Sequence, residues 1–184
     1  MPSSQIIELV GQACGVLIII INPFATQFPK RWQIMLMFSL INFISAINQL
    51  CVGNGFASAL GCGIAVIHCA INAVKAKKGI DTKKLENILW AVAYFAAWGF
   101  GVYLAARMGK ASWLDVFPFL GTVAFLGSVF FTKGREIRIS TFANNLIYFV
   151  YNIINLNVTA VSQLITMISV VIALIRFRDK KDAD

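Results

Sequence analysis

The sequence predicts an all-α integral membrane protein with seven transmembrane helices, on the evidence of its composition and of the spacing of its apolar runs. Of the 184 residues, 59% are hydrophobic and only 13% are charged, and the mean hydropathy is +0.77. A soluble domain draws about a quarter of its residues from charged types. Seven apolar runs follow one another at roughly 20 residues per span, and they leave no room for a soluble domain.

The seven helices are expected, in order along the chain, near residues 6–26, 32–52, 55–74, 85–106, 113–132, 139–155 and 158–175. The first run lacks the basic segment and the small-residue cleavage site of a signal peptide, so it is expected to remain as a helix. Only Gly53 and Asn54 separate the second run from the third, and only Leu156 and Asn157 separate the sixth from the seventh. Each of these pairs is therefore expected to form a tight hairpin.

The lysines and arginines predict how these helices are oriented in the membrane. With seven spans, fourteen of the 16 basic residues fall on one side, and only Arg107 and Lys110 fall on the other. Because cytoplasmic loops carry the excess of basic residues, the N-terminus is expected outside and the C-terminus in the cytoplasm. Helix orientation and anionic membrane lipid account for the net charge of +8. Lipid is therefore an expected partner, and nucleic acid is not.

An internal repeat is expected on either side of the fourth helix. Shifting the chain by 104 positions aligns residues 31–78 with 135–182 without a gap and matches nine of 48 positions. Apolar residues coincide readily by chance, so the polar matches carry the weight: Arg31 with Arg135, Asn48 with Asn152 and Ser58 with Ser162.

This repeat predicts the organisation of the chain. Three helices end on the side opposite to where they began, so a second copy in the same orientation needs one extra crossing. The chain then divides into a first three-helix repeat at 1–79, a linker helix at 80–110, and a second three-helix repeat at 111–184 with a short basic cytoplasmic tail.

The 3+1+3 order resembles that of the SWEET sugar transporters and their relatives with PQ-loop repeats. Over nearly the whole chain, the sequence is also similar to the bacterial inner-membrane proteins of the YgjV family, on the segments LINFISAINQLCVGNGFASALG and LIYFVYNIINLNVTAVSQLI. This similarity implies a multi-pass protein of the bacterial inner membrane. The proline-glutamine pair of the PQ-loop group is absent, since Phe24 follows Pro23. That departure counts against a SWEET-like hinge and against a sugar substrate.

Uncharged polar residues inside the expected spans are the candidates for a substrate-binding site. Asn42 and Asn145 lie in the second and sixth helices, and Asn48 and Asn152 lie about one turn from the outer hairpins. Such amides either line a path for a neutral polar solute or join helices to one another, and for Asn42 and Asn145 both interpretations stay open. Capping or loop fixing is the favoured interpretation of Asn48 and Asn152.

Two ring side chains and two prolines complete the candidates. His68, the only histidine, lies past the middle of the third helix, where it either binds a solute or a proton or is simply packed. No second strong ligand shares its face, so neither a metal nor a cofactor is expected. Trp98 in the fourth helix stays open as a binding residue. Pro23 removes a helix hydrogen bond, and Pro118 does the same if it lies beyond the first turn, so each is a candidate hinge or a static bend.

Two hypotheses for the function follow, and neither is an enzyme, because the sequence has no metalloprotease, nucleophile-elbow or Walker motif. The first is a small transporter or facilitator for a neutral or weakly polar metabolite, with alternating access between two three-helix bundles. The second is a non-transporting receptor or scaffold that binds another membrane protein.

The small residues Gly11 and Gly15 share a helix face that either packs inside the bundle or supports a homo-oligomer.

Overall fold

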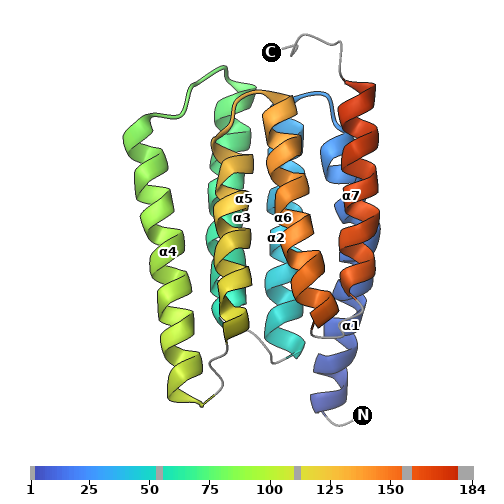
Figure 1. Ribbon diagram of the computed structural model, residues 1–184, viewed down its shortest axis with the longest axis vertical. Coiled ribbons are helices and arrows are strands. Elements are labelled where there is room, and N and C mark those ends of the chain that lie inside the picture. Colours follow the sequence, from blue (N-terminus) through green and yellow to red (C-terminus); the bar gives the residue numbers. More distant parts are fainter. Residues whose placement is uncertain (1–2, 53–55, 110–112, 155–158, 178–184) are drawn as a thin grey trace.

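The computed structural model is a bundle of helices that stand side by side (Figure 1), and it describes residues 3–52, 56–109, 113–154 and 159–177. Within these ranges there are seven α-helices and two short 3-10 segments. They are α1 (Ser3–Ile21), η1 (Asn22–Gln27), α2 (Arg31–Val52), α3 (Phe56–Lys77), α4 (Lys84–Arg107), η2 (Trp113–Asp115), α5 (Val116–Phe130), α6 (Gly134–Ile154) and α7 (Thr159–Arg176). The predicted all-helical fold and the number of helices are confirmed. The Gly53-Asn54 and Leu156-Asn157 connections lie outside the described residues.

The lengths and compositions of the helices identify a multi-pass membrane protein. Four stretches are long and apolar enough to cross a membrane: Gln5–Gln27, Arg31–Cys51, Ala59–Lys77 and Lys84–Arg107. Helix α5 and most of α7 are shorter apolar helices. The interior of a bilayer contains no water to bond the backbone, so each N–H and C=O must find its partner within the protein. An α-helix meets this requirement within a single segment.

The largest difference from the sequence-based boundaries lies at the start of α6. Hydropathy predicts a start at residue 139, whereas the helix begins at Gly134. Arg135, Glu136 and Arg138 lower the local hydropathy and move the predicted boundary towards the C-terminus. In the structure Ile137 and Arg138 are nevertheless buried in the bundle. A hydropathy window does not distinguish a charged residue in a loop from one buried on the first turns of a helix.

The helices pack as two triplets and one peripheral helix. Helix α2 packs against α1 and α3, and α6 packs against α5 and α7. We call α1, η1, α2 and α3 the first triplet and α5, α6 and α7 the second triplet. Segment η1 of the first triplet packs against α7 of the second, and α4 lies at the edge of the bundle beside α3 (Figure 1).

The basic residues gather at one end of the bundle, which we call the basic end. It is the end that holds the η1–α2, α3–α4 and α5–α6 connections and the C-terminal end of α7 (Figure 1). The described basic residues at this end are Lys30, Arg31, Lys75, Lys77, Lys78, Lys83, Lys84, Lys133, Arg135, Arg138 and Arg176. Arg107 lies at the opposite end, while Lys110, Arg178, Lys180 and Lys181 lie outside the described residues.

A hydrophobic core joins the two triplets in the half of the bundle nearer the basic end. It includes Ile34 and Met35 of α2, Cys69 of α3, Val129 of α5 and Ile137 of α6, all of which are fully buried. Because lipid is as apolar as these side chains, the core is held by close packing rather than by exclusion of water.

Close packing within the second triplet depends on a glycine of α5. A Cβ atom at Gly121 would lie 2.5 Å from Cε2 of Tyr148 in α6, so the ring occupies the space that a side chain would need. By contrast, a Cβ atom at Gly61 in α3 would meet nothing within 4 Å. The two positions therefore make a matched pair for testing how tightly α5 and α6 pack.

We expect Gly121→Ala to lower the free energy of unfolding by about 1–3 kcal/mol, because the added methyl group forces Tyr148 out of its position. Gly61→Ala is the control, and its effect is expected to be small. Thermal unfolding of the detergent-purified variants measures both. Equal stability of the two variants would show that α5 and α6 do not pack as described.

Candidate functional site

Polar side chains follow one face of α6 into the bundle. Arg138, Thr141, Asn145 and Asn152 lie at intervals of three, four and seven residues, which places them on one side of a helix, and all four are buried. The Thr141 hydroxyl donates to the Ile137 carbonyl at 2.8 Å and lies 3.2 Å from the Ser128 hydroxyl of α5. Beyond the buried arginine, towards the C-terminal end of α6, this face of the second triplet therefore carries uncharged polar side chains.

Asn42 and Asn145 bond to their own helices. The Asn42 Nδ2 donates to the Phe38 carbonyl at 2.8 Å, and the Asn145 Nδ2 donates to the Thr141 carbonyl at 2.8 Å. Asn42 is half-buried, whereas Asn145 is only 4% exposed. Neither of these bonds ties one helix to another.

Asn48 joins two helices. Its Nδ2 donates to the Gly11 carbonyl of α1 at 2.7 Å, and the same nitrogen lies 3.4 Å from the Cβ position of Gly15. The small-residue face of α1 is therefore used for packing inside the bundle. Asn144 does the equivalent in the second triplet, donating to the Gly121 carbonyl of α5 at 2.8 Å. Asn152 is 6% exposed in the last turn of α6.

His68 is enclosed by aromatic rings from α4 and α5. It is fully buried, stacks on Trp90 with ring centroids 4.4 Å apart, and lies 5.8 Å from the rings of Tyr94 and Phe130. Among the described residues, neither ring nitrogen has a hydrogen-bond partner, and the Tyr94 hydroxyl has none either. The imidazole therefore lies where α3, α4 and α5 meet.

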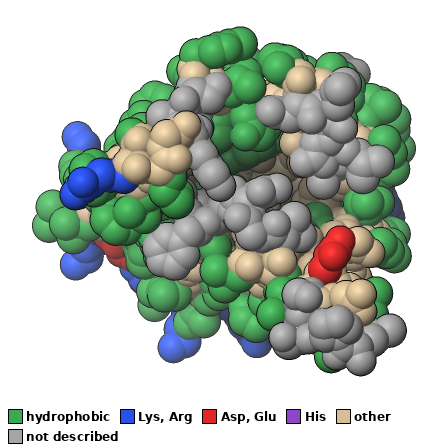
Figure 2. Space-filling model, turned by 90° about the horizontal axis from the view of Figure 1, so that it is seen from below, with side chains coloured by type: hydrophobic (Ala, Val, Ile, Leu, Met, Phe, Trp, Pro, Cys, Tyr) green, Lys and Arg blue, Asp and Glu red, His purple; other side chains and the backbone are tan. Residues whose placement is uncertain are grey.

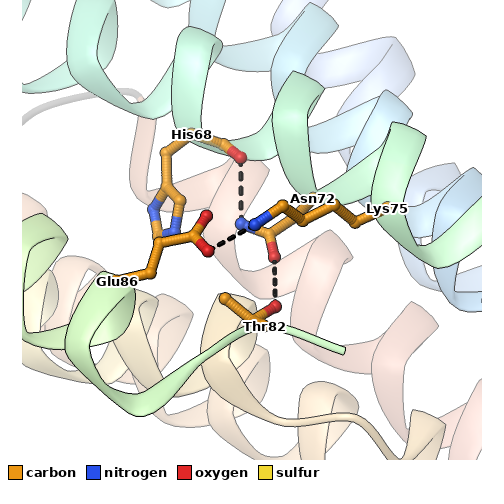
Figure 3. A network of polar contacts seen from close by, with 5 residues as sticks. All are labelled: His68, Asn72, Lys75, Thr82 and Glu86. Atoms are coloured by element: carbon orange, nitrogen blue, oxygen red, sulfur yellow. Dashed lines mark hydrogen bonds and ion pairs between the residues drawn. The ribbon is translucent and has the colours of Figure 1, made fainter. Parts of the chain in front are cut away.

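A polar network continues from His68 towards the basic end (Figure 3). The Asn72 Nδ2 donates to the His68 carbonyl at 3.0 Å, and the Thr82 hydroxyl donates to the Asn72 Oδ1 at 3.0 Å. Lys75 of α3 forms an ion pair with Glu86 of α4, whose carboxylate lies beside the imidazole in Figure 3. Sequence reasoning missed this carboxylate because eighteen residues separate Glu86 from His68.

Trp98 packs α4 against α5. Its ring lies 4.9 Å from that of Phe119, which in turn lies 5.5 Å from Phe95, so three aromatic side chains form the contact between these helices. This arrangement favours helix packing over solute binding for Trp98.

The two prolines occupy different environments. Pro23 lies at the start of η1, just after α1 ends at Ile21, so the first span changes from α to 3-10 geometry at this residue. Pro118 is the third residue of α5, where the missing N–H has no helical partner to lose. The condition for a proline kink is therefore met near Pro23 and is not met within α5.

Segment η1 is fastened to α7 of the second triplet by polar side chains. The Asn22 Nδ2 donates to the Thr166 hydroxyl at 3.1 Å, and the Gln27 Nε2 donates to the Ser169 carbonyl at 2.6 Å. The Ser169 hydroxyl donates to the carbonyl of Pro23. These bonds link residues more than 140 positions apart in the sequence.

Two arginines contact the opposite triplet at the basic end. The Arg138 guanidinium donates from Nε to the Thr26 carbonyl at 3.1 Å and from Nη2 to the Phe28 carbonyl at 2.9 Å. The Arg31 Nη2 donates to the Val129 carbonyl at 3.2 Å. Sequence reasoning assigned both to loops. A helical wheel begun at residue 134 would have placed Arg138 on the same face as Thr141 and Asn145.

Neither the two apolar hollows described below nor the possible metal ligands add a residue to the candidate binding site. Two apolar hollows, of about 400 Å³ between α2 and α3 and about 380 Å³ between α6 and α7, are lined by none of the predicted binding residues. Within the described ranges, no three His, Cys, Asp or Glu side chains come together as metal ligands would.

The amino-acid sequence was also compared with known protein families, curated proteins and solved structures. A family model described as a bacterial inner membrane protein, Imp-YgjV, matches residues 9–181, a range that extends from α1 to beyond the end of α7. The chain belongs to the Imp-YgjV family. Its predicted relation to this family and its location in the bacterial inner membrane are thereby confirmed. No curated protein and no solved structure matches the chain.

In this Imp-YgjV protein we expect Asn48→Ala to lower the free energy of unfolding by roughly 0.6–2 kcal/mol, because it removes the bond from α2 to the Gly11 carbonyl. Asn42→Ala removes only a bond within α2, so its effect is expected to be smaller. Unfolding in detergent compares the two. A larger loss with Asn42→Ala would mean that Asn42, and not Asn48, holds helices together.

Proposed function

We propose that this protein is a small transporter or facilitator for a neutral or weakly polar metabolite, which works by alternate opening of its two triplets. The observation that carries the proposal is the change from α to 3-10 geometry at Asn22 and Pro23, in the last turns of the first span. A proline is a recognised cause of a bend in a helix. Secondary transporters place irregular helix geometry at the interface between two repeats, and η1 packs against α7 of the second triplet.

The similar construction of the two triplets supports this proposal. Helices α2 and α6 begin at residues 31 and 134, and α3 and α7 begin at 56 and 159, so both pairs are offset by 103 residues. The two apolar hollows are lined by corresponding residues under the 104-residue shift, such as Leu60 with Leu164 and Ile64 with Ile168. We therefore infer a 3+1+3 repeat in which α4 is the linker.

The chemistry of the polar surface supports an uncharged substrate. Asn145 and Thr141 present an amide and a hydroxyl on the buried face of α6, and Asn42 presents an amide on α2. Amides and hydroxyls exchange hydrogen bonds with hydroxyl, carbonyl or amide groups of a solute. A charged solute would need a compensating charge that these three residues do not provide.

The proposal includes seven spans with the N-terminus in the periplasm and the basic end in the cytoplasm, as the excess of lysine and arginine favours. We expect a fluorescent protein fused to the C-terminus to fluoresce. Alkaline phosphatase fused after Gly109 should be active, because this enzyme needs the periplasm to form its disulfides. The reverse pair of results would invert the orientation and contradict the assignment.

A ligand screen tests the function itself. We expect thermal-shift screening of the purified protein against neutral polar metabolites to give a stabilising ligand, since a ligand at 100 times its dissociation constant stabilises by about 2.7 kcal/mol. Asn42→Ala and Asn145→Ala should each remove the shift. Asn144→Ala is the matched control, because this neighbouring amide bonds to the Gly121 carbonyl of α5.

The same screen can reject the transporter. A shift that persists in both Asn42→Ala and Asn145→Ala places the ligand elsewhere. No shift with any metabolite, together with uptake no higher than in empty membranes, would favour a receptor or scaffold.

The receptor or scaffold is the second candidate function, and the exposure of α4 favours it. Only Tyr94 and Gly101 of α4 are buried, while large apolar side chains such as Leu85, Leu89 and Val92 are exposed. This face is available to another membrane protein or to a second copy of the chain. Co-purification of a stable partner that is lost when the basic residues between Lys75 and Lys84 are neutralised would support this function.

A further inference from the structure

A buried arginine donates hydrogen bonds to the backbone carbonyls at the end of the first span. Thr26 lies in η1 and Phe28 is its C-terminal cap, so their carbonyls stand where a short helix ends and its own N–H groups no longer serve as donors. Arg138 of the second triplet donates to both, at 3.1 and 2.9 Å, and is only 2% exposed. Two backbone carbonyls of the first triplet thus accept hydrogen bonds from an arginine side chain of the second.

The environment of Arg138 suits an arginine specifically. The guanidinium carbon lies 4.4 Å from the ring centroid of Phe177, just after α7, so the planar cation packs on an aromatic face. Two nitrogens of the rigid guanidinium group reach two different carbonyls, which a single ammonium group cannot reproduce in the same geometry. Arg138 therefore connects η1, α6 and the end of α7 at one point.

A second arginine makes the converse contact. Arg31, the first residue of α2, donates to the Val129 carbonyl in the last turn of α5 at 3.2 Å. In both cases an arginine near the start of the second helix of one triplet bonds a carbonyl near the end of the first helix of the other. The arginine contacts therefore run in both directions between the triplets, although the 104-residue shift pairs Arg31 with Arg135 and not with Arg138.

These arginine contacts lie at the basic-end side of the hydrophobic core between the triplets. The bonds of Gln27 and Ser169 continue the connection along α7. Cys69 belongs to the core cluster that includes Ala25 and Val129, next to the bonded carbonyls in sequence, and it is fully buried. Closure of the basic end therefore keeps water away from the Cys69 thiol.

The opposite end of the bundle is built differently. The bonds from Asn48 to Gly11 and from Asn144 to Gly121 each stay within one triplet. Figure 2, which looks at this end, shows hydrophobic side chains along much of the rim of the bundle. Among the residues that the structure describes, the bonds from Arg138 and Arg31 to the opposite triplet lie at the basic end.

We propose that Arg138 and Arg31 form a latch between the triplets, and that its release opens the basic end. This inference deepens the proposed transport function and rests on it for the role of the opening. The latch itself is a property of the fold that can be measured without any substrate.

Reactivity of Cys69 in a protein whose other three cysteines are replaced by alanine tests the latch. We expect a charged methanethiosulfonate reagent to modify Cys69 at least ten times faster in Arg138→Ala than in the parent, with a smaller increase in Arg31→Ala. Lys133→Ala removes an exposed positive charge at the α5–α6 connection and is the control. Its rate should equal that of the parent.

Two further variants separate the latch from general loosening. Asn48→Ala weakens the first triplet at the opposite end and should leave Cys69 protected. Arg138→Lys keeps the charge but not the two-carbonyl geometry, so its rate should lie between those of the parent and Arg138→Ala. If Arg138→Ala does not fold, Arg138→Lys and Arg31→Ala carry the test.

The outcomes of this experiment are distinct from those of the ligand screen. Rates in Arg138→Ala, Arg138→Lys and Arg31→Ala equal to the parent rate would overturn the latch, and so would an equal acceleration by Asn48→Ala. Fast modification of the arginine variants alone supports the latch even when no metabolite binds, and in that case only the transport function fails.

Discussion

The need to satisfy every backbone polar group away from water is the constraint on which this structure depends. A helix meets that need along its length, but the first span changes to 3-10 geometry at Asn22 and Pro23, and the carbonyls at its end require donors from elsewhere. The second triplet supplies them through Ser169 and Arg138. The two halves of the chain are therefore joined through the backbone of η1.

The uncharged polar side chains divide into two groups by where their bonds go. Asn48 and Asn144 each bond the backbone of a neighbouring helix and so fix the spacing inside a triplet. Asn42 and Asn145 bond the carbonyl one turn earlier in their own helices. In a membrane protein such bonds contribute only modestly to stability, and under the proposed function the two amides that tie no helices are the ones offered to a solute.

The sequence predicts the helices and the basic end well because both are local properties: hydropathy over one span, and the sign of charge in each connection. It does not predict which polar groups meet. Arg138 and Thr26 are 112 positions apart, and hydropathy assigned the arginine to a loop. Glu86 lies next to His68 only because the α3–α4 turn brings the two helices together. Pro23 is a candidate hinge or bend from its residue type alone, but the attachment of η1 to α7 depends on contacts that no window of sequence contains.

Helix α4 is fixed to both triplets, but by contacts of different kinds. Near the basic end an ion pair between Lys75 and Glu86 and the stacking of Trp90 on His68 hold it to α3. Towards its other end, the rings of Trp98 and Phe95 pack on Phe119 of α5. At about 1.5 Å per residue, the 24 residues of α4 form a rod of about 36 Å. This length matches the ~30 Å hydrocarbon core of a bilayer, so α4 is long enough to separate α3 from the surrounding lipid along that edge of the bundle.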